Sequence, residues 1–149
     1  MKRRQFLAGL VIMPVLTRAA KAANAPVMTV SKSPTCGCCG AWVQHVRAAG
    51  FEVEVRELPD EELAALKRNL GLAPEHTACH TAQIEGYVVE GHVPAADVQR
   101  LLAERPAALG LTVPGMPAGS PGMAMGDQRE PFDTLLIRRD GTAEVFVRH

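Results

Sequence analysis

Three of the four cysteines in this chain fall within four residues, in the stretch Thr35-Cys36-Gly37-Cys38-Cys39-Gly40. Cys36 and Cys39 have the C-x-x-C spacing, which places two thiols one helical turn apart, where they can share a metal ion or close a disulfide. A disulfide exchange site needs only two sulfurs, and Cys38 adds a third soft ligand beside them. The cluster therefore favours the binding of a soft metal over disulfide exchange.

The fourth cysteine, Cys79, limits the disulfides that the chain can form. Four cysteines in an oxidising compartment would ordinarily suggest two structural disulfides. Here Cys38 and Cys39 are adjacent and Cys36 is two residues away, so at most one of the three can reach Cys79 without crowding the others. A framework of two structural disulfides is therefore disfavoured.

The elements that must position these cysteines follow from the spacing of apolar residues. Trp42, Val43 and Val46 recur at helical spacing directly after the cysteines, and Gly50 ends this helix. Residues 51–55 alternate between apolar and acidic types, which predicts a half-buried strand. The remaining predicted elements are strands at 27–30, 81–84 and 87–90, a helix over 60–70, and a helix that Pro94 opens and Pro106 stops.

This order of elements predicts an α/β fold, specifically a thioredoxin-like domain. The cysteine loop then lies at the N-terminus of a helix, where the macrodipole favours thiolate over thiol. Thioredoxin-like oxidoreductases usually carry a cis-proline facing the cysteine pair, and Cys79 stands where that proline would be expected. We therefore expect Cys79 to face Cys36, Cys38 and Cys39 across one pocket.

Residues 107–149 differ in composition and are predicted to form a metal-contacting extension of the domain. A Gly/Pro-rich loop spans 111–126 and carries three methionines, Met116, Met123 and Met125, which we call the loop methionines. Thioether sulfur is a soft ligand that suits Cu(I). The alternative is that the loop methionines fill gaps beneath the loop. The chain then closes with a β-hairpin around Asp140-Gly141, which we expect to hold the loop against the sheet.

Histidines supply the candidate nitrogen ligands. His80, beside Cys79, is the natural nitrogen donor, and the alternative is that it faces solvent. His92, just before the third helix, is predicted to be a structural partner of the cysteine loop. We expect no ligand among the remaining histidines: His45 on a helix surface, His76 in a loop and His149 at a frayed end.

Residues 1–22 read as a cleaved export signal, with a basic start, an apolar run too short to span a bilayer and a small-residue end. Arg3-Arg4-Gln5-Phe6-Leu7 resembles a twin-arginine signal, with an ordinary secretory signal as the alternative. The signal takes five of the 16 basic residues and none of the 16 acidic ones. The mature chain is then one acidic domain over 23–149 in the periplasm, without nucleic-acid partners or stable membrane insertion.

Four motifs, in this order, resemble the CopG family of periplasmic copper-resistance proteins over nearly the whole mature chain. They are Thr35-Cys36-Gly37-Cys38-Cys39-Gly40, Cys79-His80-Thr81, Glu90-Gly91-His92-Val93-Pro94, and Val113-Pro114-Gly115-Met116-Pro117 through Gly119-Ser120-Pro121-Gly122-Met123. The resemblance implies a thioredoxin-like domain with a C-terminal extension. It also implies several copper ions at the C-x-C-C motif, cycling between Cu(I) and Cu(II).

Several functions remain open at this point. The first is a redox-active copper protein of copper resistance, whose partners would be copper ions and other periplasmic copper-handling proteins. The second is a passive copper chaperone or scavenger with the same ligands. The third is a thiol-disulfide oxidoreductase in which Cys36 attacks and Cys39 resolves. An iron–sulfur site is a fourth possibility, although the loop methionines have no use there.

Overall fold

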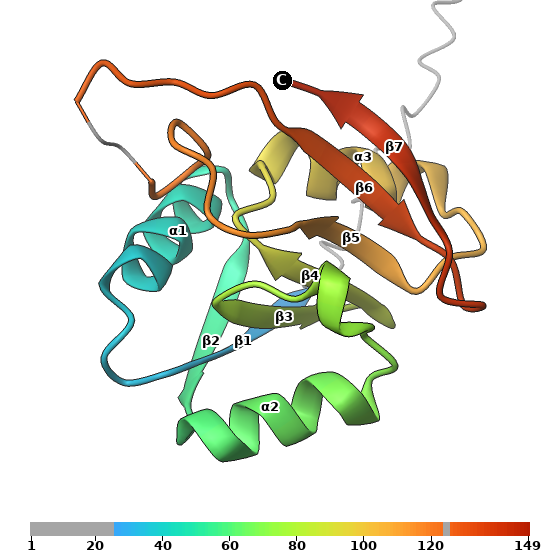
Figure 1. Ribbon diagram of the computed structural model, residues 1–149, viewed down its shortest axis with the longest axis horizontal. Coiled ribbons are helices and arrows are strands. Elements are labelled where there is room, and N and C mark those ends of the chain that lie inside the picture. Colours follow the sequence, from blue (N-terminus) through green and yellow to red (C-terminus); the bar gives the residue numbers. More distant parts are fainter. Residues whose placement is uncertain (1–25, 124–125) are drawn as a thin grey trace, which may run out of the picture.

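The computed structural model describes residues 26–123 and 126–149 (Figure 1). The export signal expected at 1–22 lies outside the described residues, and so does Met125. Within the described ranges, no helix is both long and apolar enough to cross a membrane.

Seven strands and three α-helices make up the described chain. In order they are β1 (Val27–Lys32), α1 (Gly37–Ala48), β2 (Glu52–Glu57), α2 (Asp60–Asn69), the short 3-10 helix η1 (Pro74–His76), β3 (His80–Ile84), β4 (Tyr87–Gly91), α3 (Ala95–Glu104), β5 (Gly110–Val113), β6 (Asp133–Ile137) and β7 (Ala143–Arg148). The predicted helices and strands are all present, with ends that differ by a few residues.

All seven strands belong to one sheet, in the order β2-β1-β3-β4-β5-β6-β7. β1 runs parallel to β2 and antiparallel to β3, and β4 runs antiparallel to β3 and parallel to β5. The mixed α/β fold predicted from the sequence is therefore confirmed. Through α3 the elements also follow the order on which the thioredoxin-like prediction was based.

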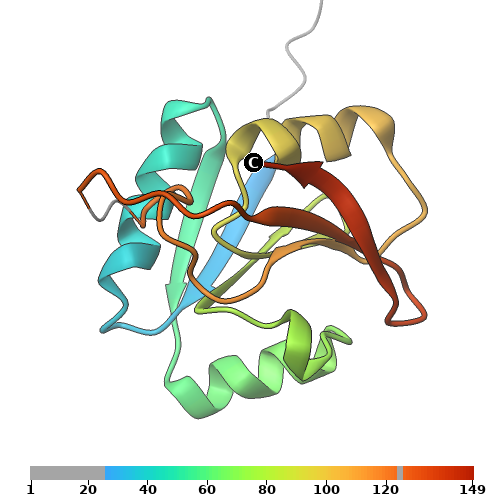
Figure 2. The same ribbon diagram turned by 45° about the horizontal axis from the view of Figure 1, so that its top comes forward.

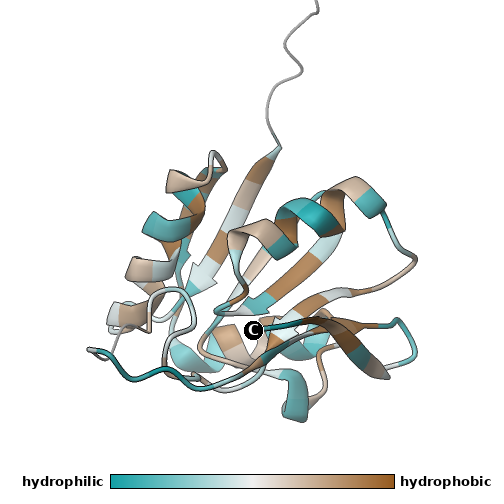
Figure 3. Cartoon of the chain, turned by 90° about the horizontal axis from the view of Figure 1, so that it is seen from above, coloured by the Kyte–Doolittle hydropathy of each residue, from teal (hydrophilic) through white to brown (hydrophobic). Residues whose placement is uncertain are grey.

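The main core lies between the sheet and two of the helices. Figure 2 shows α1 and α3 next to each other, with α2 at the opposite end of the molecule. Trp42 and Val46 of α1 join Val98 and Leu101 of α3 in one buried cluster with the central strands. In Figure 3 the strands carry most of the hydrophobic segments, while the helices alternate between hydrophilic and hydrophobic ones. This is the pattern of amphipathic helices packed on a sheet.

The extension begins differently from the prediction. Residues 110–113 form β5, not loop, because β-branched and apolar residues there pair with the buried strand β4. Gly110 permits this pairing, since a Cβ at that position would overlap the Val88 carbonyl. The predicted C-terminal hairpin is confirmed as β6 and β7, which extend the sheet at its edge.

The prediction of a half-buried strand after α1 was wrong in its burial. β2 is the opposite edge of the sheet, and five of its six residues are exposed. Only Val53 packs against the core, whereas Val55 is 38% exposed. An edge strand has a neighbour on one side only, so an alternating pattern does not guarantee that its apolar face is covered.

Candidate metal centre

The cysteine cluster opens helix α1, as the sequence predicted. Cys36 occupies the N-cap position with an extended backbone, and Cys38 and Cys39 lie in the first turn. This turn leaves backbone N–H groups free and carries the positive end of the macrodipole, which favours negative sulfur there. Cys39 is fully buried, whereas Cys36 and Cys38 are half-buried.

Cys36 and Cys39 form a disulfide, with their Cα atoms 5.4 Å apart. Cys38 and Cys79 are free thiols. The Sγ atom of Cys38 lies 3.6 Å from that of Cys36, so the third cysteine contacts the disulfide directly. The C-x-x-C pair can thus serve both in a disulfide and in metal binding. Reduction of the disulfide would release two further sulfurs at the same place.

Cys79 faces the three cysteines of α1, as expected from its place in the chain. It lies directly before β3, and the sulfurs of Cys36, Cys38, Cys39 and Cys79 are all within 4.8 Å of one another. No described peptide bond is cis, so a trans backbone carries a sulfur where a thioredoxin-like oxidoreductase would have its cis-proline. The structure therefore gathers four sulfurs from two distant segments into one cluster.

His92 is poised as a ligand, a role that the sequence did not predict for it. Its Nδ1 lies 2.7 Å from the Pro121 carbonyl oxygen, which can only accept, so Nδ1 carries the proton and donates. In the neutral ring Nε2 then holds a lone pair, and it lies 3.0 Å from the Cys79 sulfur. Histidines that bind metals commonly donate their second ring N–H to a carbonyl in this way.

His80 is fully buried, which excludes the alternative that it faces solvent. Its Nδ1 lies 3.4 Å from the Cys79 sulfur, and its ring centroid is 4.4 Å from that of Trp42. Its Nε2 has no hydrogen-bond partner among the described residues. Cys79, His80 and His92 form a second group whose donor atoms lie within 4.8 Å of one another, and it shares Cys79 with the four-sulfur cluster.

Burial keeps this group neutral. Burial, together with the nearby Cys38, raises the pKa of the Cys79 thiol to about 12. Burial also lowers the pKa of His80 to about 3 and lowers the pKa of His92. The Cys79–His92 contact is therefore a neutral thiol beside a neutral imidazole. A cation that binds here would displace the thiol proton and offset the cost of burying a thiolate.

The extension packs against the start of α1 (Figure 1). Gly122 has a φ of +88°, and a Cβ at this position would lie 2.8 Å from the backbone nitrogen of Trp42 and 2.9 Å from the Cys38 carbonyl oxygen. The loop from 114 onward thus rests on the helix that carries the cysteines. Met123 is half-buried, whereas Met116 is 53% exposed. Met123 directly follows Gly122, the residue that approaches α1 closely.

Two of the other histidines have partners that the sequence did not predict. His45 is half-buried, and its Nε2 accepts a hydrogen bond of 3.0 Å from the Ala95 N–H at the start of α3. His149 is ordered, since it contacts the buried Asp97 at 2.9 Å and stacks on Phe132. The expectation of a frayed end was wrong, because it overlooked that β7 returns beside α3.

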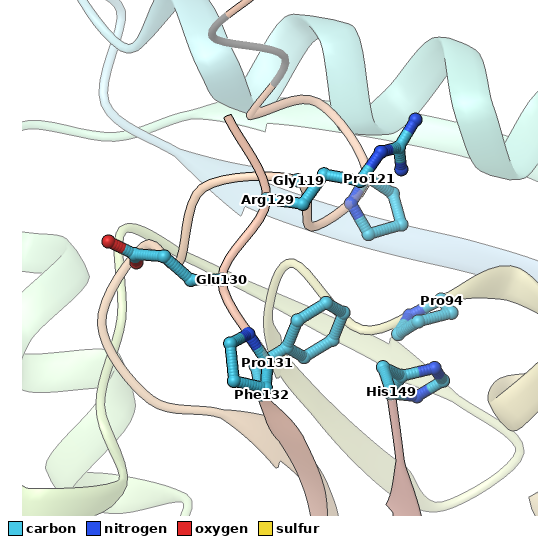
Figure 4. Close-up of a pocket in the computed structure, with 8 residues that line it drawn as sticks. All are labelled: Pro94, Gly119, Pro121, Arg129, Glu130, Pro131, Phe132 and His149. Carbon is cyan, nitrogen blue, oxygen red and sulfur yellow. The ribbon is translucent and has the colours of Figure 1, made fainter. Parts of the chain in front are cut away.

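A pocket of about 430 Å³ lies among Pro94, Pro121, Phe132 and His149 (Figure 4). None of its lining residues is a cysteine or a methionine. One lining residue, Pro121, supports His92 through its carbonyl oxygen. The pocket therefore does not coincide with the cluster of candidate ligands.

Sequence reasoning also missed two buried charged residues beside Cys79. Lys67 lies among the apolar positions of α2, and Glu90 lies in a strand whose five residues are all buried. They form a salt bridge with each other, and both bond to Thr81. A charge inside an otherwise apolar strand was the available signal, because such residues are rarely buried unless they are paired.

The fold and the site together define an α/β protein with a sulfur and imidazole cluster suited to soft metal ions. A family model described as a protein of unknown function, DUF411, matches residues 76–123. A solved structure of copper resistance protein CopG, form 2, has a TM-score of 0.78 and 39% identity, over 84% of this chain and 98% of that chain. Form 1 has a TM-score of 0.77 and 41% identity, over 83% and 96%. A search of curated proteins finds no match.

At this identity and coverage, the chain belongs to the CopG family of copper resistance proteins. The family resemblance predicted from the four motifs is thus confirmed. One of these motifs, Thr35 to Gly40, lies outside the segment that the family model matches, but it lies within the chain that adopts the CopG-like fold.

Proposed function

We propose that this protein binds several copper ions in copper resistance and interconverts Cu(I) and Cu(II). The observation that carries the proposal is the gathering of four sulfurs within 4.8 Å of one another, with two imidazoles adjoining through Cys79. The names of the two similar structures, both copper resistance proteins, point to copper among the soft metals.

The number of sulfurs favours a multinuclear site. Cu(I) is satisfied by about two or three soft ligands, and thiolate sulfur bridges metal ions readily. Four thiolates therefore exceed what one Cu(I) needs. In this proposal Cys36, Cys38, Cys39 and Cys79 supply the thiolates of a bridged copper cluster.

The mixed ligand set favours two oxidation states. Cu(I) prefers sulfur, whereas Cu(II) is stabilised by imidazole nitrogen. His80 and His92 adjoin Cys79 at 3.4 Å and 3.0 Å and supply that nitrogen. Each Cu(I) that is oxidised gives one electron to an acceptor outside the chain.

The disulfide sets a condition on copper binding. Cys36 and Cys39 can act as thiolate ligands only after their disulfide has taken up two electrons. Thiols then lose their protons as copper binds, so binding releases protons and strengthens with rising pH. The fully loaded protein is thus formed from the reduced chain.

The extension acts as a lid in this proposal. The loop methionines add weak thioether ligands or cover the cluster, and Gly122 keeps the loop against α1. Residues 23–149 act as one domain that is exported to the periplasm, with the twin-arginine route as the expected one. Other copper-handling proteins of that compartment would deliver and receive the metal.

An anaerobic titration of the reduced protein with Cu(I), against a competing chelator, tests the proposal. We expect saturation above one copper per chain and tighter binding of Cu(I) than of zinc. Cys36→Ser, Cys38→Ser and Cys39→Ser should each abolish the native stoichiometry, and Cys79→Ser should weaken binding strongly. Saturation at a single copper would contradict the cluster.

A passive chaperone or scavenger would use the same ligands without turnover. Electron paramagnetic resonance separates the two, because it detects Cu(II) and not Cu(I). We expect the copper-loaded protein to gain a Cu(II) signal with a mild oxidant and to lose it with a reductant, repeatedly and without releasing metal. Release of the metal on oxidation would favour the passive function.

The Cys36–Cys39 disulfide at the start of α1 favours a second candidate, a thiol-disulfide oxidoreductase. The reduction of insulin in the presence of dithiothreitol distinguishes it. Exchange needs Cys36 and Cys39 but not Cys38, so Cys38→Ser is the decisive variant. An active wild type with an equally active Cys38→Ser protein would support the oxidoreductase.

A further inference from the structure

The dipeptide Cys79-His80 is held at both ends by one buried carboxylate. Glu90 of β4 has no exposed surface. It accepts hydrogen bonds from the Ala78 N–H at 2.7 Å and from the Thr81 hydroxyl at 2.6 Å. Ala78 precedes the dipeptide and Thr81 follows it, so the two contacts bracket the candidate ligands.

Lys67 of α2 completes the arrangement from the other side. Its ammonium group pairs with the Glu90 carboxylate and donates to the Thr81 hydroxyl at 2.8 Å. A carboxylate paired with an ammonium group accepts hydrogen bonds more strongly than a neutral acceptor would. The pair is neutral overall, so it places no net charge beside the thiolates.

Stability alone does not explain this pair. Removing two charges from water is costly, and a buried salt bridge often contributes no more than well-packed apolar residues of similar volume. The geometry gives a more specific reason. Glu90 accepts a hydrogen bond from the backbone N–H of Ala78, the residue directly before Cys79.

The neighbouring segment is pressed against the same strand. Gly91 has a φ of +72°, and a Cβ there would lie 2.6 Å from both the Ala78 Cβ and the Val113 oxygen. Further along, the Thr112 hydroxyl donates to the His76 carbonyl at 2.8 Å. The Cys79 segment has no cis-proline to fix its backbone, and these contacts with β4 and β5 take that role.

We propose that Glu90 and Lys67 are positioning residues of the copper site, which hold the Cys79 sulfur and the His80 imidazole opposite the thiolates of α1. The copper part of this inference rests on the proposed function. The anchoring of the Cys79 segment by Glu90 does not depend on copper.

The sharpest test removes both charges together. Lys67→Met/Glu90→Met leaves no unpaired buried charge, so the fold should persist. It also removes the acceptor of the Ala78 N–H. We expect a melting temperature near that of the wild type, faster amide exchange over 78–81 in the copper-free protein, and Cu(I) binding weakened about 10- to 100-fold, as is typical when the partners of metal ligands are lost.

Two further variants act as controls. Glu90→Gln keeps an acceptor for the Ala78 N–H, but a weaker one because it is uncharged. It should therefore weaken Cu(I) binding and speed the exchange of 78–81, each less than the double variant does. Asp97→Asn alters another buried carboxylate, whose partners Thr134 and His149 lie near the C-terminal hairpin. It should lower stability without changing the Cu(I) dissociation constant or the exchange of residues 78–81.

The outcomes separate this inference from the proposed function. If the double variant folds and both binds Cu(I) and exchanges its 78–81 amides as the wild type does, the positioning role is wrong. Should it fail to fold, Glu90→Gln decides in the same way, since wild-type exchange and affinity in that variant would overturn the inference. If the wild type binds no copper while exchange still rises in the variants, the proposed function fails and the anchoring role stands.

Discussion

Replacing Gly122 by alanine should loosen the extension from the helix that carries the cysteines. Gly122 has a φ of +88°, where a side chain costs roughly 1–2 kcal/mol. The new Cβ would also lie within 2.9 Å of two backbone atoms of α1, which no side-chain rotation can relieve. The loop must therefore move away from Cys38 and Trp42.

The size of the effect follows from what the moving loop loses. Pro121 is the neighbour of Gly122, and its carbonyl accepts the hydrogen bond from His92. Loss of that bond adds about 1 kcal/mol to the conformational cost, for a total destabilisation of about 2–3 kcal/mol. His92 would also lose the contact that holds its Nε2 toward Cys79.

Gly115→Ala is the matched control within the same loop. Gly115 has a φ of +72°, but a Cβ there would meet no atom within 4 Å. It should cost only the backbone term of about 1–2 kcal/mol. Urea unfolding of the reduced, copper-free proteins measures the difference, and Cu(I) competition measures the effect on the site. Equal losses of stability and affinity in the two variants would refute the reasoning.

Three further predictions concern protonation and the lid. Burial lowers the pKa of His45, which accepts a hydrogen bond from Ala95, so the unfolded chain takes up a proton first as the pH falls. The contribution of His45 to stability is therefore present above about pH 6.5 and declines below it. Between pH 7 and pH 5, urea unfolding should show a smaller loss of unfolding free energy for His45→Gln than for the wild type. Equal losses would contradict this role. Because burial raises the pKa of Cys79 to about 12, its alkylation at pH 8 should be much slower in the native copper-free protein than in urea, as mass spectrometry can measure. A similar rate in both conditions would show that the thiol is not protected. Replacing all three loop methionines by leucine keeps the packing and removes only the sulfur, so it should raise the Cu(I) dissociation constant more than any single replacement does; unchanged affinity and spectrum would make them packing residues.

Local patterns in the sequence were sufficient for much of the fold. The spacing of Trp42, Val43 and Val46 predicted α1 and its buried face, and Asp140-Gly141 predicted the terminal hairpin. These features depend on residues a few positions apart, where periodicity and turn chemistry act directly. The burial of β2 and the pairing of β5 were not predictable in this way, because each depends on which strand lies alongside.

The sequence by itself determined that three thiols open a helix and that Cys79 precedes a strand. It could not determine which cysteines pair, and the structure joins Cys36 to Cys39 and leaves the other two free. The resemblance to a copper-resistance family came from the order of four motifs, which is a property of the sequence alone.

Only the tertiary structure made His92 a candidate ligand and Glu90 an anchor. The available nitrogen of His92 is set by the carbonyl of Pro121, 29 residues away. Glu90 pairs with Lys67, which lies 23 residues earlier in helix α2. In the sequence, the strand of Glu90 shows only apolar residues and this one charge. Burial makes these contacts decisive, since a buried polar atom must find its partner within the protein and not in water, and that partner is chosen by the packing of distant elements.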